Sequence, residues 1–278
     1  TERYLFTGNR AGKSAVLGML AVFCGTGIPP MWFLAPARVP YIGHLPWPRD
    51  NKRRLPWVTL VISHKAKSRD EAIGAAILSM LLPEWTASIK RDNGAHLEQI
   101  DVVLALPGEQ PTHMCRMLFF AQTQTEAAIM GISANTVILD EELKNPRASI
   151  YLAEAQARIS DRLGFFFHGF TPVDTAIRQG ASELIATIIK PAREGRADPP
   201  RIEIHQWSTH DNKHLTPEAR EQHDKKYRDL VTNRPKWDYA LRVLGEPVGA
   251  GLTPAIDPEY VDWQRRNAVR APVAVGRL

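Results

Sequence analysis

The sequence has few cysteines and no long apolar run, and these two shortages exclude several classes of protein. Its only cysteines, Cys24 and Cys115, are too few for a disulfide framework, so we expect a reducing compartment. The longest apolar run near the start, residues 15–24, is shorter than the ~20 residues of a membrane-spanning helix and contains Gly18. It also follows a glycine-rich turn rather than the basic flank of a signal peptide. We therefore expect a soluble protein with no membrane partner.

A large excess of charge of one sign is also missing. The 278 residues include 35 Lys and Arg against 30 Asp and Glu, a net charge of +5. Four arginines between residues 264 and 278 supply most of this excess, because no acid occurs there. The body of the protein is therefore not a uniformly basic nucleic-acid coat, and any contact with nucleic acid must come from local patches. The composition, 44% hydrophobic and 23% charged, excludes a fully disordered chain.

Short apolar strands alternate with helices along the chain, starting with a strand, a turn of small residues and an apolar helix. This order predicts an α/β fold with a mainly parallel sheet flanked by helices on both faces. The segments 100–106 and 114–121 should form a hairpin through Pro107 and Gly108, and 40–56 should be a loop or hairpin tip. We expect strands at 3–6, 31–35, 57–63, 100–106, 114–121, 136–139, 164–170 and 201–207, and helices at 14–23, 67–82, 146–163, 174–190 and 217–231.

The strongest functional signal is the loop between the first strand and the first helix, which reads Thr7-Gly8-Asn9-Arg10-Ala11-Gly12-Lys13-Ser14. It follows the phosphate-binding pattern GxxxxGK[ST], except that Thr7 replaces the first glycine and Gly8 comes one place later. Small residues let successive backbone N–H groups curl around a phosphate, and the helix N-terminus adds its dipole. Residues 8–14 are therefore predicted to bind ATP, with Lys13 on the β- and γ-phosphates and Ser14 on Mg²⁺.

Arg10 places a second cation inside this loop. Its functional interpretation is a catalytic guanidinium over the γ-phosphate, supplied by the same subunit; the alternative is a solvated side chain on a surface turn. A guanidinium beside Lys13 and a helix N-terminus is costly unless an anion neutralises it. Without nucleotide we therefore expect Arg10 to point away or to pair with Glu141 or Glu142.

A buried strand ends in three consecutive carboxylates, Asp140, Glu141 and Glu142. Such a strand delivers its last residues to the carboxyl edge of the sheet, beside the phosphate loop. Asp140 is predicted to hold Mg²⁺ through water, and Glu141 to polarise a water for attack on the γ-phosphate. Adjacent acids with these two roles indicate hydrolysis, since a kinase has to exclude water. The alternative is a cluster of acids at a helix start, which is the interpretation for Glu142.

Another apolar strand, 165–170, ends at Thr171 and Pro172. In a parallel sheet this end also faces the nucleotide, so Thr171 could sense the γ-phosphate and couple its state to the following segment. The alternative is an ordinary turn threonine.

The phosphate loop, the Asp-Glu strand and the Thr-Pro strand end stand in the order found in the large terminase subunit of tailed phages, the motor that packages viral DNA. Segment 8–14 resembles the family's phosphate loop with an internal arginine, 137–142 its Walker B segment and 170–172 its coupling motif. The segments 207–218 and 244–248 are similar to later parts of its ATPase domain.

This resemblance implies a P-loop NTPase of the ASCE/RecA-like type, with an ATPase domain at 1–250. Residues 251–278 would be a linker leading toward a C-terminal nuclease domain absent from this chain. The implied function is a motor that uses ATP and Mg²⁺ to move double-stranded viral DNA into a procapsid, as a ring of like subunits. The implied partners are the portal protein and the small terminase subunit, in the host cytoplasm. The alternatives are a nucleotide-dependent switch or binding module, and a helicase-like DNA ATPase.

Two further expectations concern basic residues. The family usually has an Arg-Gly pair before the Walker B strand where this chain has Met130 and Gly131, so an arginine finger is not expected at that position. Arg91 and Arg116 lie between the two nucleotide motifs and are candidates for a finger into a neighbouring subunit. A basic tip flanked by tryptophans is a candidate for contacts with the DNA backbone, the alternative being a solvated hairpin. The residues of this tip are Arg49, Lys52, Arg53 and Arg54.

Overall fold

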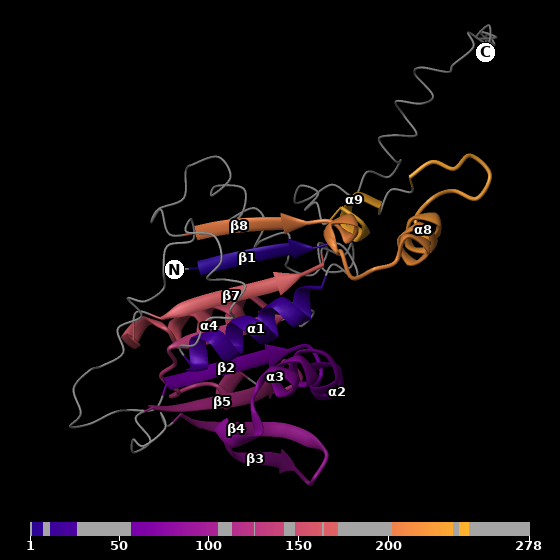
Figure 1. The fold of residues 1–278 in the computed structure, drawn as a ribbon. Coiled ribbons are helices and arrows are strands. Elements are labelled where there is room, and N and C mark those ends of the chain that lie inside the picture. The colour runs from indigo at the N-terminus through magenta and orange to yellow at the C-terminus, as the bar shows by residue number, and fades with distance from the viewer. Residues whose placement is uncertain are drawn as a thin grey trace, which may run out of the picture.

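A computed structural model describes residues 2–7, 12–26, 57–104, 113–124, 126–141, 148–162, 164–171, 202–235 and 239–244. Within these residues the chain forms an eight-stranded sheet with the order β3-β4-β5-β2-β6-β7-β1-β8 (Figure 1). The strands are β1 (Glu2–Thr7), β2 (Trp57–Ser63), β3 (Thr86–Asp92), β4 (His96–Leu104), β5 (His113–Ala121), β6 (Thr136–Asp140), β7 (Phe165–Phe170) and β8 (Ile202–Trp207).

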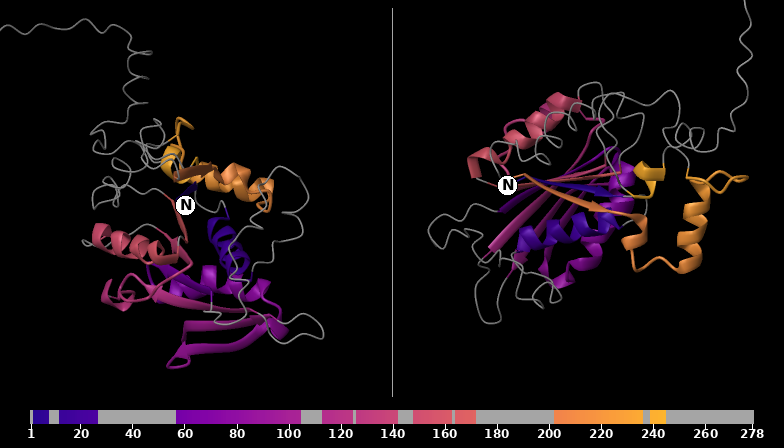
Figure 2. Two further views of the ribbon diagram at one scale, coloured as in Figure 1. Left: turned by 90° about the vertical axis from the view of Figure 1, so that its left-hand side faces the viewer. Right: turned by 90° about the horizontal axis from the view of Figure 1, so that it is seen from above.

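The six strands from β5 to β8 in this order are parallel to one another, whereas β4 pairs in antiparallel fashion with both β3 and β5 at one end of the sheet. Helices cover both faces, as Figure 2 shows from above. The described helices are α1 (Lys13–Thr26), α2 (Ala66–Arg69), α3 (Ala75–Met80), α4 (Ala148–Ala157), α8 (Pro217–Lys226) and α9 (Tyr239–Arg242). The predicted α/β class, a mainly parallel sheet between helices, is confirmed. No helix in these ranges combines the length and apolar composition needed to cross a membrane.

Two apolar layers fix the helices to the sheet. On one face, α1 packs Leu17 and Ala21 against Val61, Ile138 and Phe167 of the central strands. On the other face α4 packs Tyr151 and Ala155 against the neighbouring positions of the same strands. Because side chains alternate between the faces, a strand covered on both sides is mostly apolar on both. This is why β2 and β6 are largely apolar and are buried along their whole length.

The predicted elements agree with the described ones except at their ends and in two helices. The expected helix at 67–82 is divided into α2, a π-helical turn at Asp70–Gly74, and α3. The expected helix at 217–231 ends at Lys226, because the Asp229 carboxylate accepts hydrogen bonds from the backbone N–H groups of Val231 and Thr232 and closes a separate turn. The elements expected at 31–35, 40–56 and 174–190 lie outside the described residues.

Strand β3 was not predicted, and β4 begins four residues earlier than expected. The two form a hairpin connected by residues 93–95, in which the Ala95 N–H donates to the Asp92 carbonyl at 2.8 Å. The turn places Asn93 at φ 45° and Gly94 at φ 75°, in the left-handed region that tight hairpin turns favour. The Asn-Gly pair was the available signal for this hairpin. The antiparallel pairing of β4 with β5 confirms the predicted pairing of 100–106 with 114–121, although the Pro107-Gly108 connection is outside the described residues.

Among the described glycines, Gly164, directly before β7, is the position where an added methyl group should cost most. A Cβ on Gly164 would lie 2.3 Å from the Asn135 carbonyl oxygen, which is fixed because it accepts the Phe165 N–H. A Cβ on Gly25 would instead meet the ends of the Cys115 and Met117 side chains, at 2.7 and 2.9 Å.

We therefore expect Gly164→Ala to lower the free energy of unfolding by more than about 2 kcal/mol, and Gly25→Ala to lower it by less. Urea denaturation of both variants measures the difference. Equal losses would show that the backbone at Asn135 yields as easily as a side chain.

Candidate nucleotide-binding site

The described part of the phosphate loop starts at Gly12, whose backbone has φ +88°. Apart from its two chain neighbours, no described residue has an atom within 4 Å of the Cβ that another residue would place there. The left-handed backbone conformation is therefore the reason for glycine at this position. The Gly12 carbonyl accepts the N–H of Val16 at 3.1 Å and so opens the hydrogen-bond ladder of α1. The other predicted loop residues lie outside the described part of the chain: Gly8, Asn9, Arg10 and Ala11.

The sheet order brings the predicted site residues together at one edge. Strand β7 lies between β1 and β6, and its Gly169 is level with Leu5 on one side and Asp140 on the other. Helix α1 packs across these strands, so its first residues reach the end of β6. Lys13 and Ser14 therefore lie beside Asp140, although about 125 residues separate them in the sequence.

The Lys13 ammonium forms ion pairs with two carboxylates at once. Its Nζ contacts Asp140 Oδ1 and lies 2.8 Å from Glu141 Oε1. Only 7% of the Lys13 side chain and 2% of the Asp140 side chain are exposed. Burial lowers the pKa of Lys13, but the two carboxylates outweigh this effect and the pKa is raised above its ordinary value. The lysine is therefore fully charged at neutral pH, and its charge is compensated within the site.

Ser14 and Asp140 offer oxygen atoms at the same place. The Ser14 hydroxyl lies 3.1 Å from Asp140 Oδ2 and donates a hydrogen bond to this carboxylate. Among the described residues no three His, Cys, Asp or Glu side chains gather into a metal site of their own. Mg²⁺ needs no such cluster, because it usually takes one or two protein oxygens and completes its shell with water and phosphate. The hydroxyl and carboxylate therefore fit the predicted role in Mg²⁺ binding.

Glu141 has an unusual backbone for a residue other than glycine, with φ +75°. Its N–H donates to the carbonyl of Gly169 at 2.9 Å, and its own carbonyl accepts a hydrogen bond from the Nε2–H of His168 at 3.3 Å. Its side chain is 42% exposed, whereas that of Asp140 is buried. The two acids thus differ as their predicted roles require: Asp140 faces Ser14, and Glu141 can reach water. The carboxylate of Glu141 pairs with Lys13, and its predicted alternative partner Arg10 is outside the described residues.

Thr171 follows β7 directly and is 7% exposed. It is two residues beyond Gly169, at the edge of the sheet where Asp140 and Glu141 lie. Its predicted coupling role is compatible with this place and stays a prediction.

Three residues of the site were not predicted. The Ser63 hydroxyl at the end of β2 donates to the Asp140 backbone carbonyl at 3.2 Å. Gly169 leaves room for Lys13, since a Cβ there would lie 3.1 and 3.2 Å from Cγ and Cδ of the lysine. His168 supports Glu141 as described above. A glycine inside a strand often marks a close approach of another group, so Gly169 was open to prediction.

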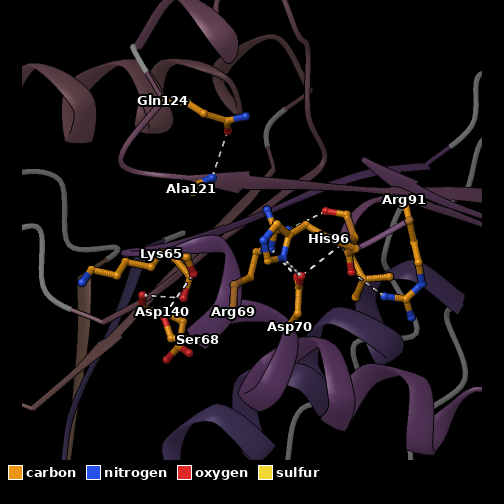
Figure 3. Close-up of polar contacts among 12 residues, drawn as sticks. Lys65, Ser68, Arg69, Asp70, Arg91, His96, Ala121, Gln124 and Asp140 are labelled. Atoms are coloured by element: carbon orange, nitrogen blue, oxygen red, sulfur yellow. Dashed lines mark hydrogen bonds and ion pairs between the residues drawn. The ribbon is translucent and has the colours of Figure 1, made fainter. Parts of the chain in front are cut away.

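The segment after β2 is held to β4 by a polar network around the buried Arg69, drawn in Figure 3. Arg69, only 2% exposed, donates to Asp70 at 2.8 Å and to the carbonyl of Leu97 at 2.6 Å. The other Asp70 oxygen bonds His96 Nδ1 at 2.9 Å and the Leu97 N–H at 3.2 Å. A buried guanidinium is stable only when paired in this way, so the network fixes the chain that leads away from Ser63.

The basic candidates lie far from the phosphate loop or outside the described residues. Arg91 is in the β3–β4 hairpin, where it donates to the carbonyl of Ala95 at 3.2 Å. Arg91 lies on the edge strand β3, four strands away from β6, whose end carries Asp140 and Glu141. It is therefore remote from the site of its own chain, and its role as a finger into a neighbouring subunit stays a prediction. Arg116 pairs with Asp101 at 3.0 Å and is level with Val58, at the opposite edge of the sheet. The predicted DNA tip at 49–54 is not among the described residues.

The fold is similar to that of large terminases of bacteriophages. The large terminase of a thermophilic bacteriophage, solved in complex with ADP, matches with a TM-score of 0.57 and 13% identity, over 88% of this chain and 48% of that one. The bacteriophage HK97 large terminase matches with a TM-score of 0.50 and 13% identity, over 88% and 46%. An arginine-to-alanine variant of the Thermus phage P74-26 large terminase ATPase domain matches with a TM-score of 0.51 and 16% identity, over 89% of each chain.

These likenesses establish the fold, that of large terminase ATPase domains, and so confirm the resemblance stated for the sequence at this level. The chain spans about half the length of the ADP-bound large terminase and of the HK97 large terminase. No protein-family model and no curated protein matches the sequence.

His168 should make the stability of the fold depend on pH. Burial lowers its pKa to about 3, with a smaller contribution from the charge of Lys13, against an ordinary value of 6.5. Between pH 6.5 and 3, His168 binds a proton in the unfolded chain but stays neutral in the folded chain. The free energy of unfolding should therefore fall as the pH is lowered from 6.5 toward 3. This residue contributes at most about 1.4 kcal/mol per pH unit. Denaturation of the wild type and His168→Leu across this range measures the contribution, and parallel pH profiles would contradict it.

Proposed function

We propose that the chain is the ATP-hydrolysing motor domain of a machine that moves double-stranded viral DNA into a procapsid. One observation carries this proposal: in a fold similar to large terminase ATPase domains, Lys13 and Ser14 of a phosphate-loop sequence converge on Asp140 and Glu141. The large terminase of the thermophilic bacteriophage was solved with ADP, which supports a nucleotide ligand for the same fold.

Each residue of the cluster has one task in this proposal. Lys13 leaves the carboxylates and binds the β- and γ-phosphates of ATP, where its charge offsets the charge that develops during transfer. Ser14 would bind Mg²⁺ and Asp140 would hold it through water; the ion, when bound, would neutralise phosphate charge. Glu141, released from Lys13, orients a water for in-line attack. Arg10 would add a cation at the γ-phosphate.

The coupling and assembly parts of the proposal rest on the resemblance to large terminases. Thr171 would report the state of the γ-phosphate to the segment that follows β7. The basic tip formed by Arg49, Lys52, Arg53 and Arg54 would contact the DNA backbone without reading its sequence. The chain would act as a ring of like subunits with a portal protein and a small terminase subunit in the host cytoplasm.

A nucleotide-dependent switch that hydrolyses slowly is the second candidate function, and a helicase-like DNA ATPase is a further alternative. The accessible carboxylate of Glu141 favours a hydrolase over the switch, because a switch does not require an acid placed to activate water. Long duplex DNA distinguishes the motor from the switch.

We expect steady-state ATP hydrolysis to increase when long duplex DNA is added, since a motor releases its products faster while it translocates. Phosphate release, measured with and without DNA at fixed salt, tests this expectation. A hydrolysis rate that is unchanged by DNA but changes when a protein partner is added would instead support the switch.

Lys13→Ala should abolish hydrolysis and weaken ATP binding, because it removes the cation that binds the phosphates. Glu141→Gln should retain binding of Mg·ATP but hydrolyse it at least ~10²-fold more slowly, the usual scale for a lost general base. Fluorescent-nucleotide titration and phosphate release measure the two quantities.

The matched controls are Lys67→Ala and Glu71→Gln, whose exposed side chains pair with each other at 3.8 Å on the α2 side of the sheet. Both controls should keep wild-type turnover. Wild-type turnover in Lys13→Ala would exclude the phosphate-loop interpretation, and unchanged turnover in Glu141→Gln would assign water activation to another residue, with Glu142 first.

A further inference from the structure

The backbone of Glu141 is in a conformation that glutamate rarely adopts. At φ +75° it lies in the left-handed region, where a residue with a Cβ is strained. Such a conformation persists only when the surrounding contacts enforce it. Glu141 follows the last residue of β6, so the turn decides where its carboxylate points.

Two consecutive residues of β7 provide the enforcing contacts. The Gly169 carbonyl accepts the Glu141 N–H at 2.9 Å, and the ring of His168 bonds the Glu141 carbonyl at 3.3 Å. Both polar groups of the Glu141 backbone are therefore bound to one neighbouring strand. The first contact continues the β6–β7 pairing, and the second comes from a side chain, so only the second depends on residue type.

The histidine is well suited to hold this carbonyl. A carbonyl oxygen can only accept, so His168 Nε2 must carry the proton. The ring is 1% exposed and lies 4.7 Å from the ring of Phe170, which restricts its rotation. Because burial lowers its pKa to about 3, the ring stays neutral with a single donor in the physiological range.

We propose that His168 is a positioning residue for Glu141: its Nε2–H bond to the Glu141 carbonyl holds the left-handed turn that points the Glu141 carboxylate at Lys13. This inference rests on the proposed ATPase function for its kinetic consequence, but not for its structural one. His168 does not touch the nucleotide in this account, and it acts only through Glu141.

The arrangement makes β7 a support for both sides of the reaction centre. Adjacent strand residues face opposite sides of the sheet. Gly169 faces α1 and leaves space for the Lys13 stem, whereas His168, on the side of Phe166 and Phe170, bonds the Glu141 carbonyl. Loss of the His168 donor should therefore disturb Glu141 and leave the Lys13 side of the site in place.

The first test separates turnover from binding. His168→Leu removes the hydrogen-bond donor, and His168→Asn places its donor farther from the Glu141 carbonyl because the side chain is shorter. His168→Gln keeps an N–H donor at a similar distance from the backbone. We expect kcat of the Leu and Asn variants to fall at least ~10-fold, because small displacements of a reacting group have effects of this size. Their ATP affinity should stay within about threefold of the wild type, and His168→Gln should recover most of kcat.

Phe166→Leu is the matched control, because Phe166 is fully buried on the same strand and face. It should lower stability without lowering kcat. The proposal is overturned if His168→Leu keeps wild-type kcat, if its ATP affinity falls as much as its kcat, or if Gln is no better than Asn at this position.

Hydrogen exchange tests the structural part without nucleotide. The Glu141 amide should exchange at least ~10-fold faster in His168→Leu than in the wild type, whereas the Phe166→Leu variant should show no such change confined to this amide. If the wild type does not hydrolyse ATP but exchange still accelerates at Glu141, the ATPase proposal fails and the positioning role stands. If the Glu141 amide exchanges at the same rate in His168→Leu as in the wild type, the positioning role is overturned, regardless of the effect on turnover.

Discussion

The structure depends on one buried cation, the Lys13 ammonium held between the carboxylates of Asp140 and Glu141. A buried charge is tolerated only when it is paired, so this contact fixes the start of α1 to the end of β6 across the intervening β7. It also compensates the charge of the lysine before any ligand enters. In the proposed function ATP with Mg²⁺ would supply these charges in exchange: the phosphates would bind Lys13, and the ion would compensate the charge of Asp140.

Strand β7 connects the two halves of the Lys13, Asp140 and Glu141 cluster. It pairs with β1, which leads into the phosphate loop, and with β6, which carries the acids. Its residues support both Lys13 and Glu141 and lead to the buried Thr171. In the proposed motor, a displacement of β7 would therefore act both on the candidate nucleotide site and on the chain that follows, as coupling requires.

The sequence predicted much of this fold because the central strands are covered on both faces and must read as apolar runs. It also predicted the cluster, since the loop and the two acids carry recognisable chemistry. The edge strand β3 was missed because its exposed residues, such as Lys90 and Arg91, resemble a loop. The π-helical turn was missed because nothing local shows that Arg69 becomes buried against Asp70. His168 was missed because a histidine in an apolar run resembles an ordinary core residue until its carbonyl partner is known.

The exchange of Lys13 between carboxylates and phosphates is the central claim, and nucleotide affinity tests it most directly. Titration calorimetry with Mg²⁺ and a non-hydrolysable ATP analogue can compare the wild type with Glu141→Gln. In the wild type the Lys13–Glu141 ion pair must break before the lysine can reach the phosphates, whereas in the variant this cost is absent. The account therefore predicts tighter binding by Glu141→Gln than by the wild type. Weaker binding by the variant would contradict it, because Glu141 would then be holding the nucleotide rather than competing for Lys13.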